Sequence, residues 1–207
     1  YLRLNNNKCK NLADLESALK SDGAGFEIIE WLDGCVLIKS AAMMFSEMSA
    51  VRCGFAYIQD ISSQICALTA AEVLKKTGSA RNSENSNRYF IDYCAAPGLK
   101  SVSVYNQLFS ENPAARRYIA LDKNFRRLMQ MSENVSRLIA GADNRSRFFL
   151  INSDIRNLPL KFRQSFQTAA ATGNLSILFD AACSGSGVIS RYPEKMLFLN
   201  KDNLTEL

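Results

Sequence analysis

Four aspartates follow four short apolar segments, at positions where carboxylates from neighbouring strands could bind one ligand. They are Asp92, Asp122, Asp154 and Asp180, and each lies at the end of its segment or within three residues of it. Acidic residues are 20 of 207, so composition alone would give such a set in roughly one chain in a hundred. Aspartate also caps helices that follow strands, which is the simpler explanation for any single site. Taken together, the four acids predict a ligand cleft.

The first aspartate lies in the stretch RYFIDYCAAPGLK, from Arg88 to Lys100. An apolar strand ends at Asp92, the chain breaks at the Ala-Pro-Gly turn of residues 96–98, and a helix opens at Lys100. A strand, a small-residue turn and a helix in this order bind ligands at the carboxyl end of a parallel sheet. The turn lacks the GxGxxG pattern that lets a pyrophosphate approach the backbone. A cofactor with a sulfonium and no phosphate therefore fits better than a dinucleotide.

Asp122 and Lys100 have side chains that suit the two ends of such a cofactor. Asp122 lies 24 residues beyond Gly98 and ends the second predicted strand, where a carboxylate can accept both hydroxyls of an adenosine ribose. That geometry serves NAD and S-adenosylmethionine equally. A lysine in the first turn of a helix is disfavoured by the helix dipole. Lys100 therefore either faces a carboxylate, that of the cofactor or of Asp180, or is a solvated surface lysine.

The fourth aspartate opens a second motif, DAACSGSGVISRYPE, from Asp180 to Glu194. The small residues from Ala181 to Gly187 allow a nucleobase to approach the backbone closely. A lone cysteine is usually a small hydrophobe. Here, however, Cys183 follows a strand-end aspartate and precedes Ser-Gly-Ser-Gly, which favours a functional role. The chain contains no histidine, so any proton transfer would use a carboxylate, lysine, tyrosine or water.

These motifs resemble those of one known family. DYCAAPGLKS, DAACSGSGVISRYPE and the earlier YIQDISSQ are similar to segments of the RNA (cytosine-5)-methyltransferases of the bacterial Sun/Fmu and eukaryotic NOL/NOP type. The resemblance covers Tyr57 to about Leu207. It implies an α/β, Rossmann-like methyltransferase fold with a parallel sheet flanked by helices. It also implies S-adenosylmethionine as cofactor, ribosomal RNA as the favoured substrate, and ribosome-assembly proteins as candidate partners.

The same resemblance implies roles for residues at matching positions. The cofactor contacts would include Asp122 at the ribose, Asp154 near the adenine, and Asp180 beside the reacting centre. The methionine end would contact the turn, whose residues are Cys94, Ala95, Ala96, Pro97, Gly98, Leu99 and Lys100. The catalytic residues would be Cys183 and Asp180, and no metal is expected.

The implied reaction forms 5-methylcytosine through a covalent adduct. Carbon 5 of cytosine is a poor nucleophile, so a thiolate adds to carbon 6 and makes carbon 5 carbanion-like. Carbon 5 then takes the methyl group, a base removes its proton, and the thiol leaves. An aspartate at the N3/N4 edge of the cytosine would favour the addition. The target base must be unstacked or already single-stranded to enter such a pocket.

Departures from the family pattern define the alternatives. Ala182 replaces the proline of Asp-Ala-Pro-Cys, and Leu99 stands where a second glycine is usual. Cys183 matches the cysteine associated with release of the methylated RNA, whereas the attacking cysteine lies in a later Thr-Cys-Ser motif that this chain does not reach. We therefore expect an incomplete catalytic domain without its C-terminal strands. The alternatives are a catalytically impaired, RNA-binding ribosome-assembly factor and a different S-adenosylmethionine-dependent or nucleotide-binding enzyme.

Composition bears on the partner and the compartment. A net charge of +5 and a pI near 8.9 fit an anionic partner, but many soluble proteins are equally basic. The six cysteines are scattered without a CxxC pair, which argues against a zinc site and favours a reduced, intracellular compartment. Cytoplasm, nucleolus and mitochondrion are not distinguished. No apolar run approaches about 18 residues, so we expect no membrane span.

Alternating strands and helices must position the motifs. Strands are predicted at 89–91, 117–121, 147–151 and 175–179. One helix begins at Lys100 and another covers 123–139, with Phe125 on its apolar face. The arginines of the second helix are predicted to face away from the core: Arg126, Arg127 and Arg137. This alternation implies right-handed crossovers and a parallel sheet, while residues 161–174 are either a short helix or a loop.

An N-terminal unit precedes the sheet. A helix at 12–20 and strands at 26–31 and 35–39 predict a small α/β unit in residues 1–56, which is either RNA-binding or an embellishment without activity. Residues 57–207 would form the methyltransferase domain. A helix capped by Asp60 is predicted to end near Lys76, ahead of a polar linker to residue 87. Its apolar stripe would be Ile61, Ile65, Leu68 and Leu74.

Overall fold

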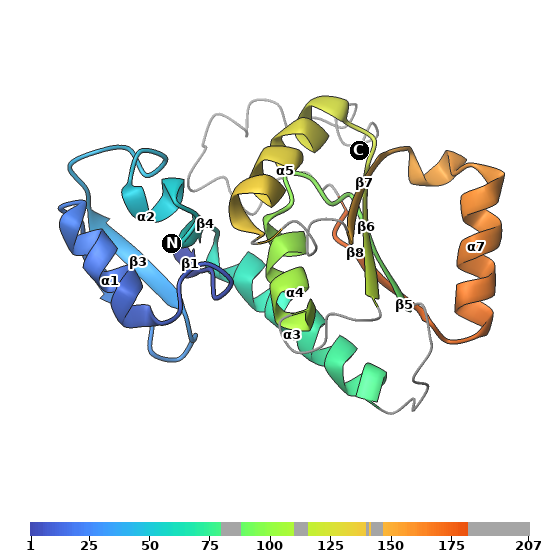
Figure 1. Cartoon of the computed structure of the whole chain (residues 1–207), viewed down its shortest axis with the longest axis horizontal. Helices are drawn as coiled ribbons and strands as arrows, with labels where there is room; N and C mark the ends of the chain where they lie inside the picture. Colours follow the sequence, from blue (N-terminus) through green and yellow to red (C-terminus); the bar gives the residue numbers. More distant parts are fainter. Residues whose placement is uncertain (80–87, 110–115, 140, 142–146, 182–207) are drawn as a thin grey trace, which may run out of the picture.

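The computed structural model describes residues 1–79, 88–109, 116–139, 141 and 147–181. Within these residues the chain forms two four-stranded sheets, in the orders β2-β3-β1-β4 and β7-β6-β5-β8. The first sheet is antiparallel and the second is parallel throughout. Figure 1 shows the two sheets in separate halves of the molecule, the N-terminal one in blue. The predicted α/β fold with a helix-flanked parallel sheet is confirmed.

The N-terminal sheet consists of short strands covered by one helix. Its elements are β1 (Leu2–Leu4), α1 (Leu12–Ser21), β2 (Gly25–Ile28), β3 (Cys35–Ser40), α2 (Ser49–Arg52) and β4 (Ala56–Ile58). Helix α1 begins where the Asn11 side chain accepts a hydrogen bond from Asp14 N at 2.9 Å, and it buries Leu15 and Leu19. Strand β4 closes this sheet and continues directly into the next helix. The division at residue 56 and the RNA-binding role of residues 1–56 stay predictions.

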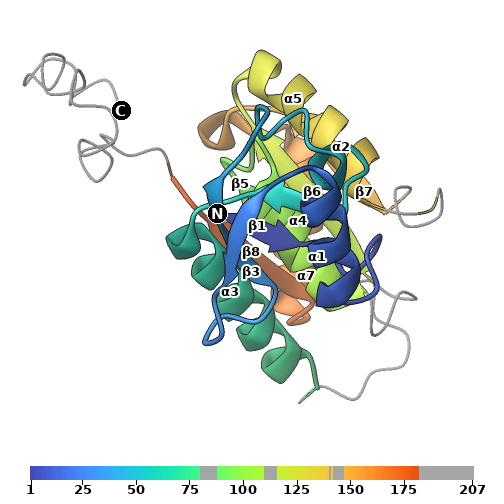
Figure 2. The same ribbon diagram turned by 90° about the vertical axis from the view of Figure 1, so that its left-hand side faces the viewer.

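The parallel sheet lies between helices of the second half of the chain. Its elements are α3 (Ile61–Ser79), β5 (Arg88–Tyr93), α4 (Leu99–Phe109), β6 (Arg116–Asp122), α5 (Phe125–Leu138), β7 (Phe148–Asn152), η2 (Ile155–Asn157), α7 (Leu160–Ala171) and β8 (Leu175–Phe179). Helices α4 and α5 cover one face and α7 covers the other (Figure 1). Figure 2, turned by 90°, shows α3 running beside α4. The undecided segment 161–174 is therefore largely helical.

Each strand of the parallel sheet sends alternate side chains into two cores. Phe90, Tyr118 and Phe148 join the core under α4 and α5, where the Tyr118 and Phe148 rings stack with centroids 4.6 Å apart. Ile91 and Ile119 face α7 instead, in a second core with Leu121 and Phe166. Burial on both faces explains why the two central strands, β5 and β6, have continuous apolar runs in the sequence.

Two helices expose residues that we predicted to be buried. Ile65 of α3 is 42% exposed, because the buried face of this helix is instead formed by Gln64, Ala67 and Ala71. These alanines let α3 lie close to α4, and the helix continues to Ser79 rather than ending near Lys76. In α5, Phe125 is 61% exposed, and the buried stripe starts at Leu128.

A buried polar contact joins the N-terminal sheet to the parallel-sheet half. The Asn5 side chain is fully buried and donates to Gly54 O at 2.7 Å and Leu138 O at 2.8 Å. Its oxygen accepts from Asn106 Nδ2 at 2.8 Å. Arg137 does not face away as predicted, because it donates to Val51 O at 2.7 Å. These bonds hold the two halves in one arrangement. Among the described helices, none has both the length and the apolar character needed to cross a membrane.

Candidate functional site

The turn between β5 and α4 is held in a shape that depends on its glycine. Gly98 has a φ of +92°, and a Cβ at this position would lie 2.5 Å from Met131 Cγ. Helix α4 starts directly after it, with Val102 N donating to Gly98 O at 2.8 Å. Cys94 also has a positive φ, of 59°, which is uncommon for a residue with a side chain. We call residues 94–98 the β5–α4 turn.

Helix α5 and strand β6 fix this turn from the side. Arg127 of α5 donates to Ala96 O, and Asn134 Nδ2 donates to Pro97 O at 2.9 Å. Ala95 N donates to Leu121 O at 3.0 Å. The carbonyl groups of Ala96 and Pro97 thus both accept hydrogen bonds from α5. These hydrogen bonds fix the backbone of the β5–α4 turn.

Asp122 lies behind the turn and is more buried than the sequence led us to expect. It is only 4% exposed. Its Oδ2 accepts from Ala96 N at 3.1 Å, and its Oδ1 accepts from Asn124 N at 2.8 Å. One carboxylate therefore connects the β5–α4 turn to the start of α5. Each carboxylate oxygen still has a second lone pair for a ligand.

A cleft of about 390 Å³ opens between the β5–α4 turn, the start of α3 and the end of β8. This volume is within the range of pockets that hold small molecules. Its lining residues are Ile58, Gln59, Asp60, Ser63, Asp92, Cys94, Ala95, Ala96, Pro97, Gly98, Leu99, Lys100, Arg127, Asp180 and Ala181. All seven residues predicted for the turn, from Cys94 to Lys100, lie together here. Of the four strand-end aspartates, Asp92 and Asp180 line this cleft.

Asp180 and Lys100 form an ion pair across the cleft. Lys100 Nζ donates to Asp180 Oδ2, and the two side chains are 25% and 43% exposed, respectively. The pair joins the first turn of α4 to the end of β8, although 80 positions separate the residues in the sequence. Lys100 was expected either to face a carboxylate, that of the cofactor or of Asp180, or to be solvated. The structure shows it in contact with the Asp180 carboxylate.

Asp92 is a buried acid at the floor of the cleft. It is 1% exposed, and its Oδ2 accepts from Ser101 Oγ and, at 3.1 Å, from the Tyr118 hydroxyl. Burial raises the pKa of Asp92 to about 7, and the charge of Asp180 acts in the same direction, whereas the bonds from Ser101 and Tyr118 oppose the rise. The carboxyl group is therefore protonated below neutral pH and ionised above it.

We expect this raised pKa to lower the stability of the protein as the pH rises. The folded form keeps the Asp92 proton up to about pH 7, whereas an unfolded chain releases it near 3.8. The free energy of unfolding therefore falls by up to about 4 kcal/mol as the pH rises from 3.8 to about 7, and this contribution is constant at higher pH. Asp92→Asn, which still accepts from Ser101 and Tyr118, should gain stability relative to wild type between pH 4 and pH 8 in urea unfolding. A difference that stays constant with pH would contradict the buried, protonated carboxyl.

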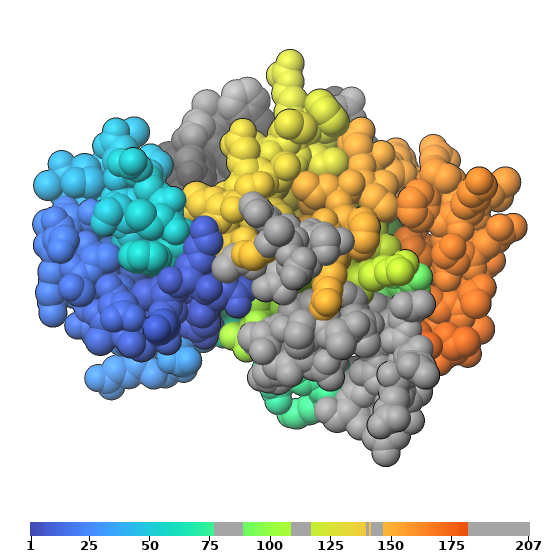
Figure 3. Space-filling model, viewed as in Figure 1, coloured from blue at the N-terminus to red at the C-terminus, as the bar shows by residue number. Residues whose placement is uncertain are grey.

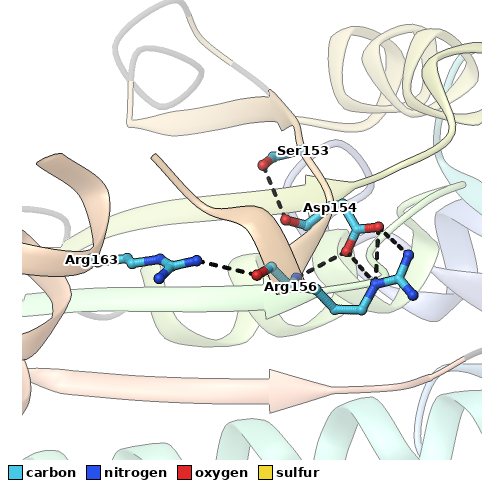
Figure 4. Close-up of polar contacts among 4 residues, drawn as sticks. All are labelled: Ser153, Asp154, Arg156 and Arg163. Atoms are coloured by element: carbon cyan, nitrogen blue, oxygen red, sulfur yellow. Dashed lines mark hydrogen bonds and ion pairs between the residues drawn. The ribbon is translucent and has the colours of Figure 1, made fainter. Parts of the chain in front are cut away.

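Asp154 lies outside the cleft lining and binds a neighbouring arginine. Figure 4 shows its carboxylate facing Arg156, whose Nη2 is 2.6 Å from Asp154 Oδ2. Oδ1 also accepts from Arg156 N at 2.9 Å and caps the short helix η2. These bonds from Arg156 lower the pKa of Asp154 to about 2. Of the four aspartates, two therefore line the cleft, Asp122 supports the turn, and Asp154 is bound to Arg156.

One predicted site residue lies outside the described part of the chain, and several residues that line the cleft were not predicted from the sequence. Cys183, with residues 182–194 of its motif, lies outside the described part of the chain. We had not predicted that Gln59, Asp60, Ser63 and Arg127 would line the cleft; the first three belong to the YIQDISSQ segment, which was the available signal. In the described part of the chain, no cluster of three or more cysteine, aspartate and glutamate side chains is arranged to hold a metal ion.

Comparisons with known proteins add to this geometry. Residues 80–206 match the sequence model of a family described as 16S rRNA methyltransferase RsmB/F. The chain is 29% identical over 153 residues to a probable ribosomal RNA small subunit methyltransferase B of Coxiella burnetii, a match that covers 74% of this chain and 30% of that protein. The corresponding Pasteurella multocida methyltransferase B is 27% identical over 194 residues, 94% of this chain and 37% of that protein. The chain thus spans about a third of the length of these relatives.

A solved structure shows the same fold. The crystal structure of a methyltransferase homologue from Pyrococcus horikoshii has a TM-score of 0.59 and 21% sequence identity, and the match covers 95% of this chain and 54% of that one. At this identity the similarity concerns the fold alone. It agrees with the Rossmann-like arrangement of β5, β6, β7 and β8.

Proposed function

Because the chain belongs to the RsmB/F family of 16S rRNA methyltransferases, we propose that it takes part in methylating carbon 5 of a cytosine in ribosomal RNA. The family depends on S-adenosylmethionine. The proposed reaction proceeds through a cysteine–cytosine adduct. In this chain Asp180 is the candidate residue for binding the cytosine, and Cys183 is the candidate for releasing the methylated RNA. The ion pair of Asp180 and Lys100, facing the β5–α4 turn in one cleft, is the observation that carries this proposal.

The cleft fits a cationic cofactor without phosphate groups. Three acidic side chains line it, those of Asp60, Asp92 and Asp180, and both cationic side chains of the described lining already bond to protein. Residues 94–100 would hold the methionine end, Asp122 the ribose, and Asp154 would lie near the adenine. When bound, S-adenosylmethionine supplies an electrophilic methyl group on its sulfonium.

Asp180 is placed to act on the base. Its Oδ2 is bonded to Lys100, and we propose that its Oδ1 faces the N3/N4 edge of the cytosine. Lys100 would keep Asp180 oriented and stabilise negative charge on the base as the thiolate adds. Cys183 follows Asp180 by three residues, so its thiol would enter the site from the same loop. By the resemblance, its part is to release the methylated RNA from the adduct.

The charge distribution supports RNA binding by the second half of the chain. Residues 1–56 contain six lysines and arginines against seven acids, whereas residues 57–207 contain 19 against 13. Phosphate binding depends on such a cationic excess. We therefore propose that the parallel-sheet half supplies most of the attraction for RNA. Association with ribosome-assembly proteins and an intracellular location remain part of the proposal.

The test is chemical and uses the full-length protein. Small-subunit ribosomal RNA, incubated with the protein and methyl-labelled S-adenosylmethionine, should yield 5-methylcytidine when its nucleosides are analysed by mass spectrometry. RNA containing 5-azacytosine should trap a covalent complex. Cys183→Ala should accumulate an adduct on ordinary RNA, while Cys66→Ala, an exposed cysteine on α3, should behave as wild type. RNA binding without label or adduct would instead support the ribosome-assembly factor.

A further inference from the structure

Cationic side chains lie close together where α5, η2 and α7 begin, at the carboxyl edge of the parallel sheet. Asn152 Nδ2 donates to Lys123 O at 3.1 Å, so the chain just before α5 lies beside the end of β7. Arg156 bonds to Asp154, and Arg163 Nη2 donates to Arg156 O at 3.2 Å. In Figure 3 the start of α5, in yellow, projects from the upper edge of the molecule, and the orange atoms of η2 and α7 lie to its right.

This cluster has more cations than carboxylates. Its exposed cationic side chains are those of Lys123, Arg126, Arg156 and Arg163, whereas Asp154 is the one carboxylate that these contacts include. The bonds from Arg156 lower the pKa of Asp154 most, and the nearby charge of Lys123 acts in the same direction. Because one carboxylate offsets one cation, the cluster keeps an excess of three positive charges. Such an excess attracts an anionic partner.

An exposed aromatic ring lies within the cluster. Phe125 is the first residue of α5, between Lys123 and Arg126 in the sequence, and it is 61% exposed. The buried stripe of the helix starts only at Leu128, so the ring adds little to the core. A ring flanked by cations suits a partner that has both flat apolar surfaces and negative charge. Single-stranded RNA has both, since its unpaired bases stack on aromatic side chains and its phosphates bind cations.

The cluster lies beside the proposed reacting centre and not within it. Asp180 follows β8, and β7 is the third strand from β8 in the order β7-β6-β5-β8. Neighbouring strands are about 4.8 Å apart, so the end of β7 is roughly 14 Å from the end of β8. With the target base at Asp180, neighbouring nucleotides of the same strand would therefore reach the cluster. We call Lys123, Phe125, Arg126, Arg156 and Arg163 the α5–α7 patch.

We propose that the α5–α7 patch binds the single-stranded RNA that flanks the target base. Its cations contact phosphates, and the Phe125 ring stacks on one base. This inference rests on the proposed function, since it takes RNA as the substrate. It assigns RNA contacts to the carboxyl edge of the sheet next to the cofactor cleft, because none of the patch residues lines that cleft.

The first experiment tests stacking. Binding of single-stranded oligocytidine RNA to the full-length protein is measured by fluorescence anisotropy over a range of KCl concentrations. Phe125→Ala should weaken binding about 5- to 100-fold without changing its salt dependence, because a stacking surface is lost and no charge is removed. Phe125→Tyr keeps an aromatic ring and should bind as wild type does. Weaker binding by both variants, or by neither, would overturn the inference.

The second experiment tests the phosphate contacts in the same assay. Arg126→Gln and Arg163→Gln should each reduce the slope of log affinity against log salt by about 0.7, and the affinity by about fivefold at 0.1 M KCl, because one phosphate contact is lost. Lys76→Gln, which removes an exposed lysine near the end of α3, is the matched control for charge and should change neither quantity. Equal effects of all three variants would show a general response to net charge and overturn the inference.

Two further measurements separate the inference from its alternatives. S-adenosylmethionine, titrated by calorimetry, should bind Phe125→Ala and Arg126→Gln as it binds wild type, and a matching loss of cofactor affinity would assign the patch to the cofactor instead. Polyglutamate that binds wild type as tightly as oligocytidine would mark a site for acidic proteins and also overturn the inference. Patch variants that bind RNA normally would overturn it while leaving the proposed function intact. Failure of wild type to bind RNA would overturn both.

Discussion

Asp122→Ala is expected to weaken S-adenosylmethionine binding by at least about 100-fold. The Asp122 carboxylate accepts from Ala96 N at 3.1 Å and from Asn124 N at 2.8 Å, so it sets the position of the β5–α4 turn relative to α5. Its remaining lone pairs are the proposed acceptors for the two ribose hydroxyls. Hydrogen bonds to a charged group contribute about 1.5–3 kcal/mol each, and two of them account for the expected loss.

Calorimetry on the purified protein, with S-adenosylmethionine as the ligand, measures this effect. Thermal unfolding should accompany it, because alanine also leaves the buried Ala96 N without its partner. Glu27→Ala is the control, since that exposed carboxylate pairs with Lys39 on the N-terminal sheet, and it should leave the affinity unchanged. If a folded Asp122→Ala protein bound the cofactor with wild-type affinity, the ribose would have to lie elsewhere.

The parallel sheet could be predicted because its two central strands, β5 and β6, are buried on both faces. Side chains such as Ile91 and Ile119 alternate with Phe90 and Tyr118 between two apolar cores, which leaves an uninterrupted apolar run in the sequence. Strands β1 and β4 were missed, since three residues each are too few to show a period. The buried face of α3 was also misjudged. Hydrophobicity favours isoleucine and leucine for burial, but close contact with α4 selects alanine.

The part of the candidate site that lies in one contiguous motif could be predicted from the sequence. The residues that tertiary packing brings to the cleft from distant positions could not. Residues 94–100 are contiguous, so their grouping follows from sequence alone. The side-chain direction of Asp122 and Asp154 depends on which N–H groups lie near each strand end, and no spacing rule specifies this. Gln59 lies 35 positions before Cys94 and reaches the cleft only because β4 pairs with β1 ahead of α3. Contacts of this kind come from tertiary packing.

Asp180→Asn is expected to lower kcat by about 100- to 10,000-fold, while S-adenosylmethionine affinity changes by no more than a few fold. The substitution preserves the shape of the side chain but removes the charge that Lys100 faces in the cleft. The proposed reaction uses the Asp180 carboxyl group to bind the N3/N4 edge of the base as the thiolate adds, whereas the ribose and methionine sites use other residues. Single-turnover methylation of ribosomal RNA measures the first effect and calorimetry measures the second.

Lys100→Met, alone and combined with Asp180→Asn, tests whether Lys100 acts through Asp180 or has a role of its own. If Lys100 acts by orienting Asp180, the double variant should be about as slow as Asp180→Asn alone, because residues that act as a unit are not additive. Glu72→Gln, which removes an exposed carboxylate on α3, is the control for a change in net charge and should leave kcat unchanged. Independent, additive losses would show that Lys100 has a separate role. Equal losses in kcat and cofactor affinity would assign Asp180 to cofactor binding instead of to the reacting base.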